Sequence, residues 1–169
     1  GADASLSGPK KWGLEDYKQT EHLLHLLDDY DVKGTFACVG YAALRGELPY
    51  HAPQQIREMA ERGHEVASHA WEHEWIPDLG PDELISVLKR SKSQLEEASG
   101  RSVISFAPPW NAPTKYMRKG AIGLYQRRRS KYDRVDIPTL CRALKQTGYK
   151  TNRVTYESIP QTLSRHLLR

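Results

Sequence analysis

Apolar residues recur along the chain in blocks that alternate between helix-like and strand-like spacing. Between Gly13 and Asp31, leucines and tyrosines recur with helical spacing, which predicts an amphipathic helix. The run 34–40 is rich in β-forming residues and bounded by glycines, which predicts a short buried strand. A helix over 53–63, opened by a proline and closed by a glycine, and a strand over 65–70 follow.

The same alternation continues in the second half of the chain. Leu84, Leu88 and Leu95 form one face of the next predicted helix, which begins at a proline and ends at a glycine. This helix covers 81–100. A strand over 103–107 and a looser stretch over 113–136 follow it. The last predicted elements are a helix over 137–147, a strand over 149–156 and a short terminal helix over 159–169.

Strands that alternate with helices predict an α/β fold with a mainly parallel sheet, either open or closed into a barrel. No internal repeat, low-complexity tract or Gly/Ser linker divides the chain, so we expect one domain over 1–169. Functional groups of such folds gather at the carboxyl ends of the strands. That rule points to the residues just after Val39, Ala67 and Phe106 and to the start of the chain.

Composition narrows the class of protein. The 169 residues carry a net charge of +4 and a mean hydropathy of −0.68, as expected of a soluble globular domain with a sizeable core. No apolar run reaches the length of about 18 residues that a membrane span needs. Cys38 and Cys141 are too few for a disulfide scaffold, and we expect both to be small core residues. The pI near 9.0 leaves nucleic-acid binding open.

His69 and His73 are the most informative residues. They stand four positions apart at the end of a predicted strand, where two imidazoles can converge on one ion. A catalytic zinc ion usually has three protein ligands, so a third is required, often a carboxylate. The alternative is a pair of surface or helix-cap histidines. The order His-Ala-Trp-Glu-His is not the His-Glu-x-x-His of zinc proteases, so Glu72 is expected beside the ligands or in solvent.

The context of this pair resembles the polysaccharide deacetylase family, also called the NodB-homology domain. The resemblance is carried by the strand 34–40, the Gly-His-Glu turn at 63–65, the His69–His73 segment and the run 106–110, Phe-Ala-Pro-Pro-Trp. It extends from about residue 3 to residue 111. It implies a distorted (β/α) barrel, a divalent ion held by both histidines, and hydrolysis of N-acetyl or related acyl groups on a glycan.

The first and third motifs of the family are incomplete in this chain. By resemblance Asp3 is the third metal ligand, the alternative being a solvated terminal residue. The catalytic base would then precede Gly1, so we expect a domain truncated at its N-terminus that lacks the first strand of the barrel. Ala107 stands where the family has an arginine that helps to orient the base.

Four further residues are expected to shape the substrate groove: Phe106, Pro108, Trp110 and Trp71. Core packing is the alternative for both tryptophans. Backbone N–H groups between residues 36 and 40, or after Pro108, are candidates to hold an oxyanion. Zinc is the expected metal, although cobalt, nickel and iron accept the same ligands.

The remaining histidines are expected to have ordinary roles. His22 and His25 fall on a helical pattern and should face water, His51 belongs to a loop, and His64 lies against a helix end. His166 is the only late histidine and therefore the candidate general acid, although a surface position is the simpler interpretation.

Two other functions stay open. One is a catalytically degenerate glycan-binding domain of the same fold, favoured by the missing base and arginine. The other is a nucleic-acid-binding module that uses the basic run 127–131, which begins Arg127-Arg128-Arg129. A solvated loop, an anionic glycan or a homo-oligomer contact would also explain that run. The resemblance leans to a secreted or cell-envelope protein, but no signal segment is visible.

Overall fold

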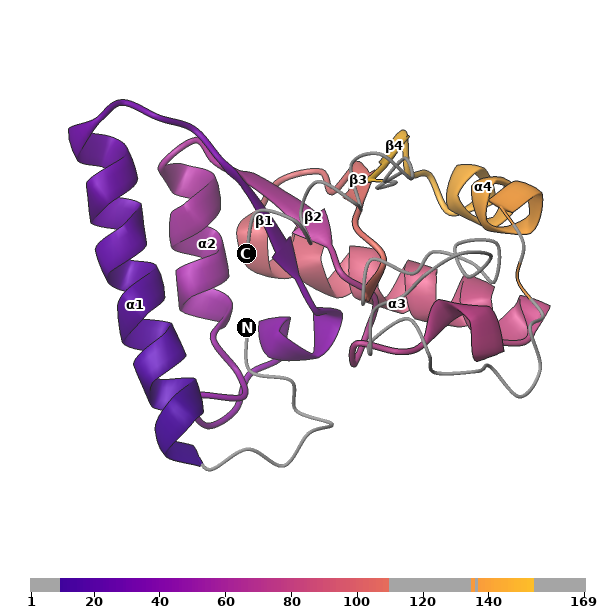
Figure 1. The fold of residues 1–169 in the computed structure, drawn as a ribbon, viewed down its shortest axis with the longest axis horizontal. Helices are drawn as coiled ribbons and strands as arrows, with labels where there is room; N and C mark the ends of the chain where they lie inside the picture. Colours follow the sequence, from indigo (N-terminus) through magenta and orange to yellow (C-terminus); the bar gives the residue numbers. More distant parts are fainter. Residues whose placement is uncertain (1–9, 110–134, 136, 154–169) are drawn as a thin grey trace, which may run out of the picture.

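The structure, a computed structural model, describes residues 10–109, 135 and 137–153 (Figure 1). The helices of this part are α1 (Lys10–Asp29), α2 (Pro53–Glu61), α3 (Pro81–Ser99) and α4 (Ile137–Gln146), with the short 3-10 helices η1 (Gly40–Ala43) and η2 (Ile76–Asp78). The strands are β1 (Thr35–Cys38), β2 (Glu65–Ser68), β3 (Ser105–Phe106) and β4 (Thr151–Asn152). The fold is therefore α/β, as predicted.

The described strands form one parallel sheet in the order β1-β2-β3-β4. Thr35 pairs with Glu65, and Phe106 pairs with both Ser68 and Asn152. A helix lies between each pair of consecutive strands along the chain. Sequential order is typical of (β/α) barrels, whereas doubly wound sheets reverse their order.

Proline and glycine set the helix boundaries where the sequence predicts them. Pro53 and Pro81 are the first residues of α2 and α3, where the missing N–H group has no helical partner to lose. At the other end of α3, Gly100 adopts a left-handed φ of 68° that other residues rarely adopt. The predicted boundaries of both helices are correct to within two residues.

The core lies between the sheet and the helices α2 and α3, which pack against each other and against β2. Its largest fully buried side chains include Leu84, Leu88 and Leu95, as predicted for that face of α3. From α1, Leu24 is completely buried, whereas Leu23 is 43% exposed. The long helix α1 therefore lies at one margin of the described fold (Figure 1).

One face of the sheet carries a row of polar side chains. Thr35 donates a hydrogen bond to Glu65 across 2.8 Å, and the Ser105 hydroxyl bonds to both Glu65 and Thr151. The prediction that the strand 34–40 is buried is therefore wrong for this face, where Thr35 and Ala37 are exposed. Glu65, which pairs with Thr35 from the neighbouring strand β2, is exposed on the same face.

The helix predicted over 137–147 is present as α4 and ends within one residue of the expected position. In α4, Leu140, Ala143 and Leu144 face the core, and Cys141 is exposed, which corrects the expectation that it is a core residue. The strand expected over 149–156 comprises Thr151–Asn152 in the described part of the chain. Most of the looser stretch 113–136 and the predicted helix 159–169 lie outside the described residues. No described helix has the length and apolar character required to span a bilayer.

Candidate functional site

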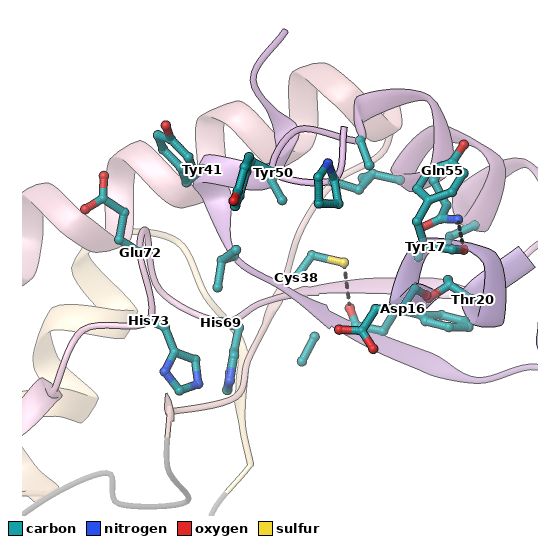
Figure 2. A pocket seen from close by; sticks show the side chains of 18 residues that line it. Asp16, Tyr17, Thr20, Cys38, Tyr41, Tyr50, Gln55, His69, Glu72 and His73 are labelled. Atoms are coloured by element: carbon teal, nitrogen blue, oxygen red, sulfur yellow. Dashed lines mark hydrogen bonds between the residues drawn. The ribbon is translucent and has the colours of Figure 1, made fainter. Parts of the chain in front are cut away.

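The structure brings the two predicted histidines together at the carboxyl end of the sheet. His69 follows β2 directly, and its N–H group donates to the carbonyl of Cys38, which extends the pairing with β1. The ring centroids of His69 and His73 are 4.8 Å apart, with an interplanar angle of 64°. Both side chains line the same pocket (Figure 2).

A hydrogen bond fixes the protonation of the His69 ring. Its Nδ1 atom lies 2.7 Å from the carbonyl oxygen of Ala107, just after β3. A carbonyl oxygen only accepts, so Nδ1 carries the proton and Nε2 keeps its lone pair. Burial lowers the pKa of His69, the hydrogen bond to Ala107 opposes this shift, and the charge of His73 adds to it. The neutral form with a free Nε2 lone pair is the form that binds a metal ion.

The backbone between the histidines is unusual. Ala70 and His73 adopt left-handed φ angles of 65° and 68°, which non-glycine residues seldom adopt. The Glu74 carboxylate stabilises this turn, because its Oε2 atom accepts from the N–H groups of Trp71 at 2.9 Å and Glu72 at 3.0 Å. These contacts hold the segment that carries His73.

The turn is also tied to its surroundings. The carbonyl of Ala70 accepts from the Ser91 hydroxyl of α3 at 2.8 Å and from the N–H group of Gly40 at 2.9 Å. A Cβ atom on Gly40 would lie 2.7 Å from the Ser91 Cα and 2.8 Å from the Trp71 ring. Only glycine permits this approach between the end of β1, the turn and α3.

The N–H group of Gly40 was one of the expected oxyanion donors, but it already has a backbone partner. The N–H group of Gly40 donates to Ala70, and that of Tyr41 donates to Trp71. Neither group is available to a substrate. After Pro108, the next residue is Pro109, which has no N–H group.

His69 and His73 are suitable metal ligands, but a catalytic site usually needs three protein ligands and the described residues supply these two. Two imidazoles, one with its Nε2 lone pair free, suit zinc and similar ions. Within residues 10–109, 135 and 137–153, no group of three or more His, Cys, Asp or Glu side chains could hold an ion. Asp3 and His166 lie outside the described residues, as does the basic run 127–131.

The expected sugar contacts are largely buried. Phe106 is 1% exposed and packs against the ring of Tyr149, and Pro108 is buried beside it. Trp71 is 4% exposed, with the Arg90 guanidinium 3.7 Å above its ring. These positions favour a packing role for the rings of Phe106 and Trp71. Trp110 lies outside the described residues.

Beside the histidines lies a pocket of about 310 Å³. Sequence reasoning missed Tyr41 and Tyr50 as lining residues, because only η1 and the segment after it bring them there. Glu72 is exposed and lines the same pocket as the histidines. Cys38 also lines the pocket, and burial raises the pKa of its thiol to about 12. The thiol is therefore protonated at neutral pH and is a poor nucleophile or ligand.

The other histidines differ from one another. His22 and His25 are exposed on α1, as predicted. His64 is 5% exposed, and its Nδ1 atom accepts from the N–H group of Gly34 at 3.3 Å. Burial lowers the pKa of His64, and the charge of Lys33 adds to the shift. His64 is therefore a buried neutral residue at the start of the sheet.

The protein is an α/β protein whose parallel strands follow the sequential order of a (β/α) barrel, with a histidine pair at the carboxyl edge of the sheet. Residues 10–124, more than half of the chain, match the family described as polysaccharide deacetylase. The chain belongs to the polysaccharide deacetylase family, which confirms the resemblance found in its motifs.

Three similar proteins share 18–25% sequence identity with this chain. The peptidoglycan-N-acetylglucosamine deacetylase PgdA of Listeria monocytogenes is 25% identical over 105 residues, which are 62% of this chain and 21% of PgdA. The chain thus spans about a fifth of that relative. The deacetylase PplD of Streptococcus pyogenes, solved with acetate, has a TM-score of 0.57 at 18% identity, covering 84% of this chain and 62% of PplD.

A third similar protein is BA3943 of Bacillus anthracis, which is described as a CE4 family pseudoenzyme. The structure of a BA3943 mutant, described as having restored enzymatic activity, has a TM-score of 0.57 at 18% identity. It covers 80% of this chain and 39% of the mutant. These structural similarities show the NodB-type barrel fold.

Proposed function

We propose that this chain is the deacetylase domain of a metal-dependent enzyme that hydrolyses N-acetyl or related acyl groups on an amino-sugar polymer. One observation carries the proposal. His69 donates from Nδ1 to Ala107, which leaves Nε2 for a ligand bond, and the ring of His73 lies 4.8 Å away. Family membership and the similarity to PgdA support an acetylated glycan as the substrate class.

In this proposal His69, His73 and Asp3 hold the ion, zinc being the first candidate and cobalt, nickel or iron the alternatives. Two imidazoles and one carboxylate are a common catalytic zinc set. When bound, such an ion lowers the pKa of water and polarises an acyl carbonyl. The Ala107 carbonyl fixes the direction of the His69 ring, and Glu74 keeps the turn in the shape that presents His73.

The metal content of the purified protein tests this proposal. Native mass spectrometry should find about one divalent ion per chain, as in catalytic sites of this ligand type. The His69→Ala/His73→Ala double variant should lose it. A matched control is His22→Ala/His25→Ala, which removes two exposed histidines from α1 and should keep the ion. Absence of an ion from the wild type after incubation with zinc, or equal loss in both variants, would contradict the metal site.

Acetate release then tests the activity. Substrates are N-acetylglucosamine oligomers and peptidoglycan, and the same two double variants are compared. Activity that is resistant to chelators and survives loss of both histidines would overturn the proposed chemistry.

A glycan-binding domain without catalysis is the second candidate. It is favoured by Ala107, which stands where the family has an arginine, and by the lack of a third described ligand. Glycan binding without acetate release, from a protein that carries no ion, would establish this alternative.

A further inference from the structure

The pocket beside the histidine pair has an aromatic wall. Tyr41 belongs to η1, and Tyr50 lies in the segment between η1 and α2. Both line the same pocket as His69 and His73 (Figure 2). Tyr17 and Phe36 also line this pocket, and Figure 2 shows Tyr41 and Tyr50 on the same side of it as Glu72, with Tyr17 at the far end. Among the described aromatic residues we therefore consider Tyr41 and Tyr50 as contacts for a ligand at the histidines.

Tyr41 is held in place on two sides. Its ring lies edge-on to Trp71, with centroids 6.1 Å apart, and 4.6 Å from the ring of His51. Its N–H group donates to the Trp71 carbonyl at 2.9 Å. A ring fixed before binding costs little conformational entropy when a ligand arrives.

The segment that carries Tyr50 is closed on itself. The His51 Nδ1 atom lies 3.1 Å from the Tyr41 carbonyl, and the Ala52 N–H group donates to the Ala42 carbonyl at 2.8 Å. The His51 ring fills the space beside Gly46, where a Cβ atom would lie 2.1 Å from it. These contacts fix the backbone on both sides of Tyr50.

Tyr50 itself remains accessible, with 38% of its surface exposed. A sugar ring presents an apolar face of C–H groups and a polar edge of hydroxyls. A tyrosine matches both, because its ring is apolar and its hydroxyl donates and accepts. The exposed Glu72 carboxylate lines the same pocket and adds an acceptor for sugar hydroxyls.

We propose that Tyr50, whose neighbour His51 contacts Tyr41, binds the sugar ring whose acyl group lies at His69 and His73. This inference rests on the proposed function, since it assumes a glycan at the histidine pair. It assigns substrate contact to the segment between η1 and α2 instead of to Trp71 and Phe106.

The test compares Tyr50→Ala, Tyr50→Phe and the control Tyr30→Ala. Tyr30 is also an exposed tyrosine, 73% accessible just after the end of α1, and it is not among the residues that line the pocket. The probe is the tetramer of N-acetylglucosamine. Its Kd is measured by calorimetry at low temperature, where turnover is slow. Its KM and kcat are measured by acetate release. The metal content of each variant is recorded.

Tyr50→Ala should weaken tetramer binding by about fivefold to tenfold, the loss expected for one aromatic contact, with KM changing more than kcat. Tyr50→Phe should recover most of that loss because it keeps the ring. Tyr30→Ala should bind like the wild type, and all three should retain the ion.

Three results separate this inference from the proposed function. Unchanged binding by a metal-loaded Tyr50→Ala variant would overturn the inference and leave the proposed function standing. A metal-loaded wild type that does not bind the tetramer would overturn the inference as well. Tetramer binding that depends on Tyr50, in a protein without metal or acetate release, would support the inference and overturn the enzymatic proposal.

Discussion

His69 and His64 have opposite ring protonation. The Nδ1 atom of His69 donates to the Ala107 carbonyl, whereas the Nδ1 atom of His64 accepts from the Gly34 N–H group. In the neutral form the proton is therefore on Nδ1 in His69 and on Nε2 in His64. Nitrogen-15 NMR at pH 7.5 should resolve these two tautomers. Observation of the Nε2–H form for His69 in the metal-free protein would contradict the predicted ligand atom.

Glu74 should control metal affinity without binding the metal. Its carboxylate accepts from the N–H groups of Trp71 and Glu72, so Glu74→Ala should release the turn that carries His73. Loss of such a supporting contact typically weakens metal binding by about 10–100-fold. Titration against a chelator measures the change. Glu74→Gln, which keeps an accepting oxygen, should restore most of the affinity. Equal affinity in Glu74→Ala would show that the turn holds its shape unaided.

Gly40 should tolerate no side chain. Its Cβ position lies 2.7 Å from the Ser91 Cα, a backbone atom that cannot rotate away. Gly40→Ala should lower the free energy of unfolding by about 1–3 kcal/mol, as overpacked sites do. Gly34→Ala is the matched control, since its nearest atoms are 3.9 Å away. Urea unfolding of both variants checks the prediction, which fails if the two are equally stable.

Stability should fall in mild acid because of His64. Burial lowers the pKa of His64, so the unfolded chain takes up its proton at a higher pH than the folded chain. The free energy of unfolding should therefore decrease as pH falls below the ordinary value of about 6.5 and through the lower folded pKa. Lys33 and Arg62 oppose protonation of His64 in the folded state, and Asp28 favours it.

Comparison of His64→Asn with wild type isolates this effect. Asparagine can still accept from the Gly34 N–H group but does not titrate. Urea unfolding at pH 7.5 and pH 5.5 should show a smaller loss of stability in this variant. His22→Asn, an exposed change on α1, should behave like the wild type. A wild-type dependence retained in His64→Asn would assign the effect to other groups.

Much of the fold could be predicted from local signals. Pro81 and Gly100 mark the ends of α3 because their backbones restrict where a helix can start and stop. The histidine pair could be placed after a strand by its position in the sequence. The left-handed backbone at Ala70 and the role of Glu74 could not, because both depend on the folded turn.

Exposure was harder to predict than secondary structure. Phe106 ends a strand, and its place in the sequence suits a groove as well as a core. Its burial follows from Tyr149, which is distant in the sequence and packs against it. Tyr50 carries no motif, and it joins the pocket only through the contacts of His51 with Tyr41. Such long-range packing has no local pattern.

The contact between Gly40, Trp71 and Ser91 couples the histidine turn to α3. The turn cannot open while α3 stays docked, because the Ser91 hydroxyl and the Gly40 amide both hold the Ala70 carbonyl. The turn and α3 therefore form one cooperative unit of opening, and their amides should exchange hydrogen together. Heating that loosens α3 would also separate the two histidines, so loss of tertiary structure and loss of the proposed metal site would coincide in this protein.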